Sequence, residues 1–256
     1  MTAVTTPTHS PASPGARVWR VVRLLTANPA TTIGMPLLIV GLIFLATWFI
    51  WWMIMSSVSG TDAADAADGI RYNGASAWIF FYMLVVAVQA VNLTFPLALG
   101  YGSTRRAFST GAGLTWVLLS AGYALVMTFG RWLEQLTDGW GVHGSFFGSA
   151  YFATDAGWLA QWWIYFCWFV FFFFTGMIFA AVFVRWKAFG LTTALLVLGA
   201  LVVAGVAILT FTGSWGGFWE RVIELGTLGV ASVLLVPAVL AAGLGHLLLR
   251  RATPRS

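Results

Sequence analysis

Charged side chains are scarce in this sequence. Asp, Glu, Lys and Arg make up 8% of its 256 residues, whereas about 25% is usual in a soluble globular domain. Hydrophobic residues make up 60% and include 15 Trp and 21 Phe. So few polar side chains cannot cover a chain of this size in water. The composition therefore excludes a soluble monomer and predicts a membrane protein.

The residues that most enzymes use are also few. A single cysteine, Cys167, excludes a disulfide framework or a zinc cluster within the chain. The single lysine, Lys187, stands in no phosphate-binding P-loop. The sequence contains neither a paired-histidine metalloprotease motif nor a GxSxG motif. We predict no catalytic residue, no metal and no cofactor on this chain, and no enzyme activity of its own.

Long apolar runs fill most of the remaining sequence. A bilayer core about 30 Å thick requires roughly 20 apolar residues per helix. Six runs come close to this length, and none contains Asp, Glu, Lys or Arg. Barrel strands would be about ten residues long. The sequence thus predicts an all-α membrane protein with six transmembrane helices, at residues 33–55, 78–99, 114–130, 159–184, 191–211 and 227–249.

The charges between these runs predict the topology. Lys and Arg near helix ends are retained in the cytoplasm. On alternate loops and both ends of the chain lie ten basic residues and no acidic ones: Arg17, Arg20, Arg23, Arg105, Arg106, Arg185, Lys187, Arg250, Arg251 and Arg255. The other loops hold three arginines and all eight acidic residues. We expect both termini inside a multi-pass protein of the cell membrane. The basic residues form no single surface, which disfavours nucleic acid as a partner.

The segment before the first run has two parts. Residues 1–15 are rich in Thr, Ser, Pro and Ala, which predicts a disordered cytoplasmic tail. Residues 16–28 place valines and a leucine on one helical face and arginines on the opposite arc, typical of an interfacial helix on an anionic leaflet. Its anchors are Arg17, Trp19, Arg20 and Arg23. A cytoplasmic stub with accidental periodicity is the alternative. Residues 29–252 form the expected transmembrane domain and 253–256 a short tail.

The second run contains polar residues at helical spacing. Gln89, Asn92 and Pro96 share one helical face, and the same run contains Thr94. Amides in lipid need hydrogen-bond partners, so this face is expected to meet protein or a wet cavity. Gln89, Asn92 and Thr94 are candidates for a substrate path. Hydrogen bonding between helices is the alternative use of such residues.

A glycine-flanked turn follows that run. Ser103 or Thr104 is suited to cap a helix, and an arginine pair is followed by an aromatic side chain. This segment could dock onto a partner, or it could be an ordinary cytoplasmic turn whose arginines set the topology. The candidate docking residues are Ser103, Thr104, Arg105, Arg106, Ala107, Phe108, Ser109 and Thr110.

Four stretches carry a resemblance to a known family: FPLALG at 95–100, TRRAF at 104–108, GWG at 139–141 and FFG at 146–148. They resemble permease subunits of actinobacterial ABC transporters, similar to the type 2 exporter class. The resemblance implies six spans, an interfacial helix before the first, and a coupling segment at 103–110 that inserts into a separate ATPase subunit, which would bind ATP and Mg²⁺. It also implies a second permease copy or a related permease. The exporter class has a re-entrant hairpin where this chain has residues 212–225.

Two functions remain open from the sequence. The first is a permease subunit that exports a hydrophobic or amphipathic compound, with an outer loop at 131–157 serving as an exit gate or as a membrane anchor. The second is a non-transporting membrane scaffold, immunity or sensory protein that binds a partner through the same inner loops.

Overall fold

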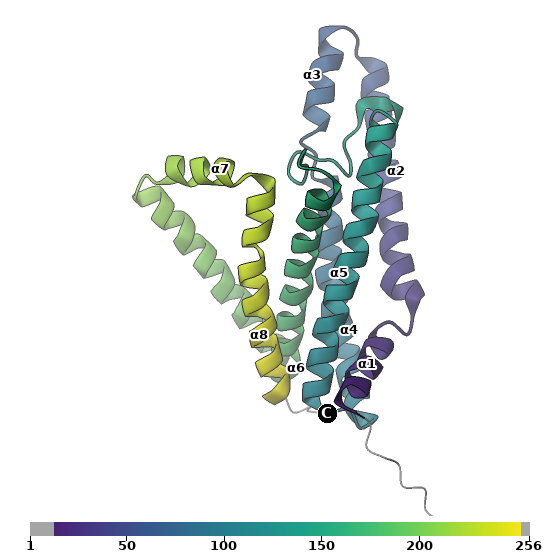
Figure 1. The fold of residues 1–256 in the computed structure, drawn as a ribbon. Helices are drawn as coiled ribbons and strands as arrows, with labels where there is room; N and C mark the ends of the chain where they lie inside the picture. The colour runs from purple at the N-terminus through teal and green to yellow at the C-terminus, as the bar shows by residue number, and fades with distance from the viewer. Residues whose placement is uncertain (1–12, 252–256) are drawn as a thin grey trace, which may run out of the picture.

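The computed structural model describes residues 13–251 and is all-helical, without a strand in that part of the chain (Figure 1). Residues 1–12 of the predicted tail and residues 253–256 lie outside the described residues. Three short turns join the longer helices: η1 (Ala30–Gly34), η2 (Ala75–Ala77) and η3 (Gly139–His143). The helices are α1 (Pro14–Leu25), α2 (Met35–Ser57), α3 (Thr61–Ile70), α4 (Trp78–Gly100), α5 (Arg105–Leu136), α6 (Trp158–Phe211), α7 (Trp215–Val233) and α8 (Leu235–Arg251).

Five helical stretches are long and apolar enough to cross a membrane. The sequence predicted six runs, and the difference arises in α6, which contains both 159–184 and 191–211. Lys187 interrupts α6 with non-helical backbone angles (φ 57°, ψ −150°). The part of α6 after this break leans away from the first part (Figure 1). The five stretches are Ala30–Ser57, Asp62–Gly100, Arg105–Leu136, Trp158–Phe211 and Trp215–Arg250.

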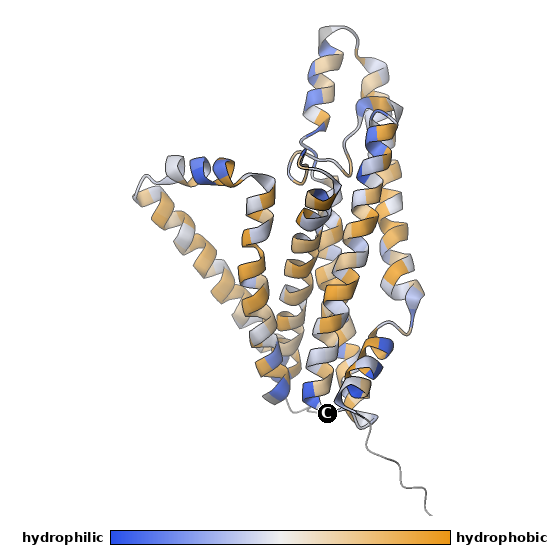
Figure 2. Cartoon of the chain, viewed as in Figure 1, coloured by the Kyte–Doolittle hydropathy of each residue, from blue (hydrophilic) through white to orange (hydrophobic). Residues whose placement is uncertain are grey.

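The two ends of the helix bundle differ in charge. At one end lie α1, the beginning of α5 and the end of α8, with their arginines (Figures 1 and 2). We call this the basic end. At the opposite end lie α3, the end of α5 with the loop that follows it, and the first part of α7, which carry the acidic residues (Figures 1 and 2). We call this the acidic end. The apolar helix surface between them matches the expectation that ionised groups stay out of lipid.

Residues 212–225, where the exporter class has a re-entrant hairpin, form a turn and then a helix. The part of α7 from Trp215 onward lies across the acidic end, and the chain bends again at Gly226 (φ 60°, ψ −178°) before it runs back along α8 (Figure 1). Gly226 suits this bend because a residue without Cβ tolerates a positive φ.

Aromatic side chains form the core between α4, α5 and α6. Trp116 of α5 stacks on Phe173 of α6, with ring centroids 5.1 Å apart. Phe80 of α4 contacts Phe169 of α6 at 4.8 Å. All four side chains are fully buried. Such pairs add about 0.5–1.5 kcal/mol each beyond their burial, so they stabilise the packing of α4 and α5 on the part of α6 before Lys187.

The amphipathic segment is present as α1, two residues earlier than the sequence predicted. Ser13 caps it by accepting a hydrogen bond from the Ala16 amide (3.3 Å), and Pro14 occupies the first turn. Pro14 and Gly15, assigned to the tail from their composition, therefore belong to the helix. Val21 and Leu25 are buried against the core.

The close contact between α4 and α6 gives a stability prediction. A Cβ at Gly176 would lie 2.5 Å from the Leu84 carbonyl oxygen and 2.8 Å from the Ala87 Cβ. Gly176→Ala should therefore overpack this contact and destabilise the protein by about 1–3 kcal/mol. Gly199→Ala, where a Cβ meets open space, is the matched control. Thermal unfolding in detergent should show a lower Tm for Gly176→Ala alone, and equal Tm values would contradict the packing.

Candidate functional site

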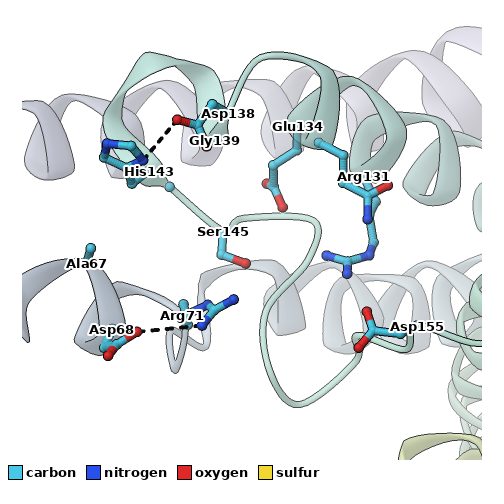
Figure 3. Close-up of a pocket in the computed structure, with 12 residues that line it drawn as sticks. Ala67, Asp68, Arg71, Arg131, Glu134, Asp138, Gly139, His143, Ser145 and Asp155 are labelled. Atoms are coloured by element: carbon cyan, nitrogen blue, oxygen red, sulfur yellow. Dashed lines mark ion pairs between the residues drawn. The ribbon is translucent and has the colours of Figure 1, made fainter. Parts of the chain in front are cut away.

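A polar cavity of about 420 Å³ opens at the acidic end (Figure 3). Residues from α3, from the end of α5 and from the loop that follows α5 surround it. A second cavity of about 490 Å³ shares several of these residues. The first cavity is lined by Ala67, Asp68, Arg71, Arg131, Glu134, Gln135, Asp138, Gly139, His143, Gly144, Ser145 and Asp155.

Glu134 organises this site. Its side chain is 4% exposed although it carries a carboxylate. The carboxylate accepts hydrogen bonds from the Phe147 amide (2.9 Å), the Gly148 amide (2.8 Å) and the Trp140 indole (3.4 Å). Burying a carboxylate is costly unless it is hydrogen-bonded, and these three donors meet that requirement. Glu134 thus joins the end of α5 to the loop at 139–157.

Arg131 lies one turn before Glu134 and shares its surroundings. A Cβ at Gly148 would collide with the Arg131 guanidinium and would lie 2.6 Å from a Glu134 carboxylate oxygen. Gly148 therefore allows the loop to approach both side chains. The Tyr165 hydroxyl of α6 donates a hydrogen bond to the Phe147 carbonyl, so α6 also supports the loop.

The other charged groups lie around the cavity rim. Arg71 pairs with Asp68 at 3.5 Å, and His143 pairs with Asp138 at 3.2 Å. Asp155 lies on the side of the cavity toward which the Arg131 guanidinium points (Figure 3). Groups of both signs suit a polar ligand. Among the described residues, no cluster of three or more His, Cys, Asp or Glu could hold a metal ion.

The loop backbone adopts an unusual conformation beside the cavity. Asp138 (φ 50°), Trp140 (φ 62°) and His143 (φ 52°) all have positive φ, which is rare for residues other than glycine. The Trp48 indole of α2 donates to the Trp140 carbonyl (3.2 Å). Such conformations persist where their surroundings fix them, as at binding sites.

A loop that serves as a membrane anchor would expose its aromatic side chains to the outer leaflet. Phe146 and Phe152 are instead buried inside the protein, at 1% and 4% exposure. Phe146 contacts Phe44 of α2, with ring centroids 5.4 Å apart. Trp132 and Tyr151 are exposed. Most of the apolar surface of the loop is therefore packed against the helices.

The predicted docking segment 103–110 lies at the basic end, where α5 begins. Thr104 caps α5 by accepting a hydrogen bond from the Ala107 amide (3.1 Å). Thr104, Arg106 and Thr110 are exposed, and Ser103 and Arg105 are half-buried. Ala107, Phe108 and Ser109 are buried. The exposed surface available to a partner is thus polar and basic.

Two buried side chains hold this segment to the bundle. Phe108 contacts Phe95 of α4, with ring centroids 5.1 Å apart, so the aromatic side chain is absent from the docking surface. The Ser109 hydroxyl and the Nδ1 atom of His246 in α8 are hydrogen-bonded at 2.8 Å. A displacement of the segment would therefore also displace α4, through Phe108, and α8, through Ser109.

The candidate substrate-path residues lie on α4. Gln89 is exposed, and Asn92 is half-buried with a carbonyl oxygen that has no hydrogen-bond partner. The Thr94 hydroxyl donates to the Ala90 carbonyl (2.6 Å). None of these three side chains lines the cavities described above. The structure therefore separates them from the polar cavity at the acidic end.

The four predicted interfacial anchors lie on α1. Trp19, Arg20 and Arg23 are exposed, and Arg17 is half-buried beside the docking segment. Sequence reasoning missed Arg71, Arg131 and Glu134 as site residues. An acidic residue directly after an apolar run and before a glycine-rich loop was the available signal for Glu134.

Comparison of the chain with protein-family models, curated proteins and solved structures finds no match.

The three hydrogen bonds to Glu134 give a prediction about the loop. Each carboxylate oxygen of Glu134 accepts a hydrogen bond from one backbone N–H. Glu134→Gln replaces one of these oxygens by an NH₂ group, which cannot accept. At least one hydrogen bond to a charged acceptor, worth about 1.5–3 kcal/mol, is therefore lost. Hydrogen exchange at the Phe147 and Gly148 amides should become about 10- to 100-fold faster. Gln135→Ala, at the exposed neighbouring position, is the control. Unchanged exchange in Glu134→Gln would show that the carboxylate does not hold the loop.

Proposed function

We propose that this chain is the permease subunit of an ABC transporter of the cell membrane. A separate ATPase subunit, which carries ATP and Mg²⁺, docks at residues 103–110 and supplies the energy. The exported compound is hydrophobic or amphipathic, because no ionised side chain lies within the apolar runs. The basic end and both termini face the cytoplasm, in accord with the retention of Lys and Arg inside.

The observation that carries this proposal is the continuity of α5. The helix runs without a break from Arg105 at the basic end to Leu136 at the acidic end. Phe108 and Ser109 fix its first turns to α4 and α8, and Glu134 fixes its last turn to the outer loop. A force applied at residues 103–110 would reach the polar cavity through one rigid element. Rigid elements of this kind transmit switching movements between distant sites.

The proposal includes six membrane crossings. With the backbone break at Lys187, α6 supplies two of them, joined by a turn that carries Arg185 and Lys187 at the basic end. The apolar run 191–211 then returns to the acidic end, and residues 227–249 form the last crossing. An even number of crossings accounts for the basic residues near both ends of the chain.

A second permease copy or a related permease completes the transporter. Gln89 is exposed near the middle of α4, and the Asn92 carbonyl oxygen lacks a partner. Polar amides at this depth need protein or water beside them. A path for the exported compound between two permeases, lined by Gln89 and Asn92, meets that requirement. Thr94 lies on the opposite side of α4 and bonds to the Ala90 carbonyl of its own helix.

Charge reversal at the docking segment tests the proposal. Arg105 is half-buried at the first turn of α5. The partner of a basic docking surface would present acidic groups to it. Arg105→Glu would place a carboxylate against these groups, and such a contact between like charges costs several kcal/mol. The variant should therefore release an ATPase subunit that copurifies with the tagged chain from its own membranes. Arg250→Glu reverses a charge at the same end and should leave copurification unchanged. The readout is the identity and amount of the copurified protein.

Two results would contradict the permease. In one, the chain is isolated without a nucleotide-binding protein. In the other, it is isolated with a partner that has no nucleotide-binding motif, which would favour the scaffold, immunity or sensory function.

A further inference from the structure

A third cavity, of about 540 Å³, lies at the basic end between α1 and the start of α5. The two elements that enclose it are 80 or more residues apart in the sequence. Arg17 comes from α1 and Arg106 from α5. The complete lining is Pro14, Gly15, Arg17, Val18, Thr104, Arg106, Ala107 and Thr110.

The cavity is positively charged, and the chain has no acidic side chain close to it. The eight Asp and Glu residues lie within 62–68, 134–155 and 220–224, all at the acidic end. The ion pairs Arg71–Asp68 and His143–Asp138 involve neither Arg17 nor Arg106. Within residues 13–251, Arg17 and Arg106 thus line one space that no acidic side chain lines.

The surrounding backbone adds to this charge. Helices α1 and α5 both begin at the cavity, at Pro14 and Arg105. Helix N-termini carry a partial positive charge that favours anions. Hydroxyl groups of Thr104 and Thr110 lie beside the arginines and can donate hydrogen bonds to phosphate oxygens.

The walls of the cavity are held in place. A Cβ at Gly111 would lie 2.6 Å from the Val21 Cβ and 2.9 Å from the Val18 carbonyl oxygen. Gly111 therefore lets α1 pack directly on α5. Trp19, which is 50% exposed, lies on the same helix, and exposed tryptophan is typical of the headgroup level of a membrane.

We propose that this cavity binds the phosphate headgroup of an anionic phospholipid of the inner leaflet. Arg17 and Arg106 bind the phosphate, the threonine hydroxyls support it, and the acyl chains extend along the apolar helix surface. Basic pockets between helices at the cytoplasmic side of a membrane bind such headgroups. The bound lipid joins α1 to the first turn of α5. This proposal concerns the isolated chain and is tested without an ATPase partner. The cavity shares Thr104, Arg106 and Thr110 with the docking segment, so the lipid and an ATPase subunit would contact the same part of α5.

Thermal unfolding of the purified full-length chain in a neutral detergent tests the site. The probes are short-chain phosphatidylglycerol, short-chain phosphatidylcholine and free glycerol phosphate. Phosphatidylglycerol should raise the Tm saturably at concentrations where the other two do not. An equal effect of glycerol phosphate would assign the site to a soluble phosphate and overturn the lipid proposal. An equal effect of phosphatidylcholine would overturn headgroup recognition.

Variants locate the effect in the cavity. Arg17→Gln and Arg106→Gln should each weaken the affinity for phosphatidylglycerol about fivefold, given the contribution of one arginine near an anionic surface. Thr110→Trp fills the cavity without changing charge and should weaken binding as well. Arg250→Gln, outside the cavity at the same end, should bind as the unchanged protein does. Equal affinity in Arg17→Gln, Arg106→Gln and Arg250→Gln would refute the site.

Discussion

Helix α5 is the element on which the rest of the structure depends. Helix α1 packs on its first turns at Gly111, α8 meets it through the Ser109–His246 hydrogen bond, and α6 stacks on it at Trp116. Its last turn positions Glu134, which holds the loop at 139–157. The two ends of the molecule are thus connected through one continuous helix.

The separation of charge along the bundle follows from the membrane as a solvent. Ionised side chains are costly in hydrocarbon, so the chain places most of its basic residues at one end, and its carboxylates together with three arginines at the other. The single deeply buried carboxylate, among the described residues, is that of Glu134, and its cost is offset by three N–H donors. The same separation leaves Arg17 and Arg106 without acidic partners at the basic end. A positive cavity at that end is a consequence of the topology, and an anionic headgroup is the complementary group that a membrane supplies.

The sequence predicted the elements whose signal is local. The valine spacing that identified the amphipathic segment describes the buried face of α1, and the apolar runs lie within α2, α4, α5, α6 and α8 together with the end of α7. The predicted run 114–130 is shorter than α5, because hydropathy marks the lipid-facing part of a helix and not its polar ends. The helix α3, rich in Ala and Asp, has no apolar run and was not predicted.

Residues whose role depends on tertiary contacts were beyond sequence reasoning. Glu134 acquires its role from amides 13 and 14 residues further along the chain, which no spacing rule relates to a carboxylate. Phe108 stands two residues after the exposed Arg106, but its side chain packs in the core against Phe95. The cavity shared by Arg17 and Arg106 arises because α1 folds back on α5 at Gly111, a contact between distant parts of the chain.

The central claim is that a nucleotide-binding subunit contacts the basic end, and site-specific photo-crosslinking in native membranes tests it directly. Tyr101, 80% exposed beside the docking segment, can be replaced by a photoreactive phenylalanine analogue of similar shape. Tyr151, 57% exposed in the outer loop, is the matched position at the acidic end. The account predicts a crosslink from position 101 to an ATP-binding protein and none to that protein from position 151. A crosslink to the ATP-binding protein from position 151, or none from position 101, would contradict it.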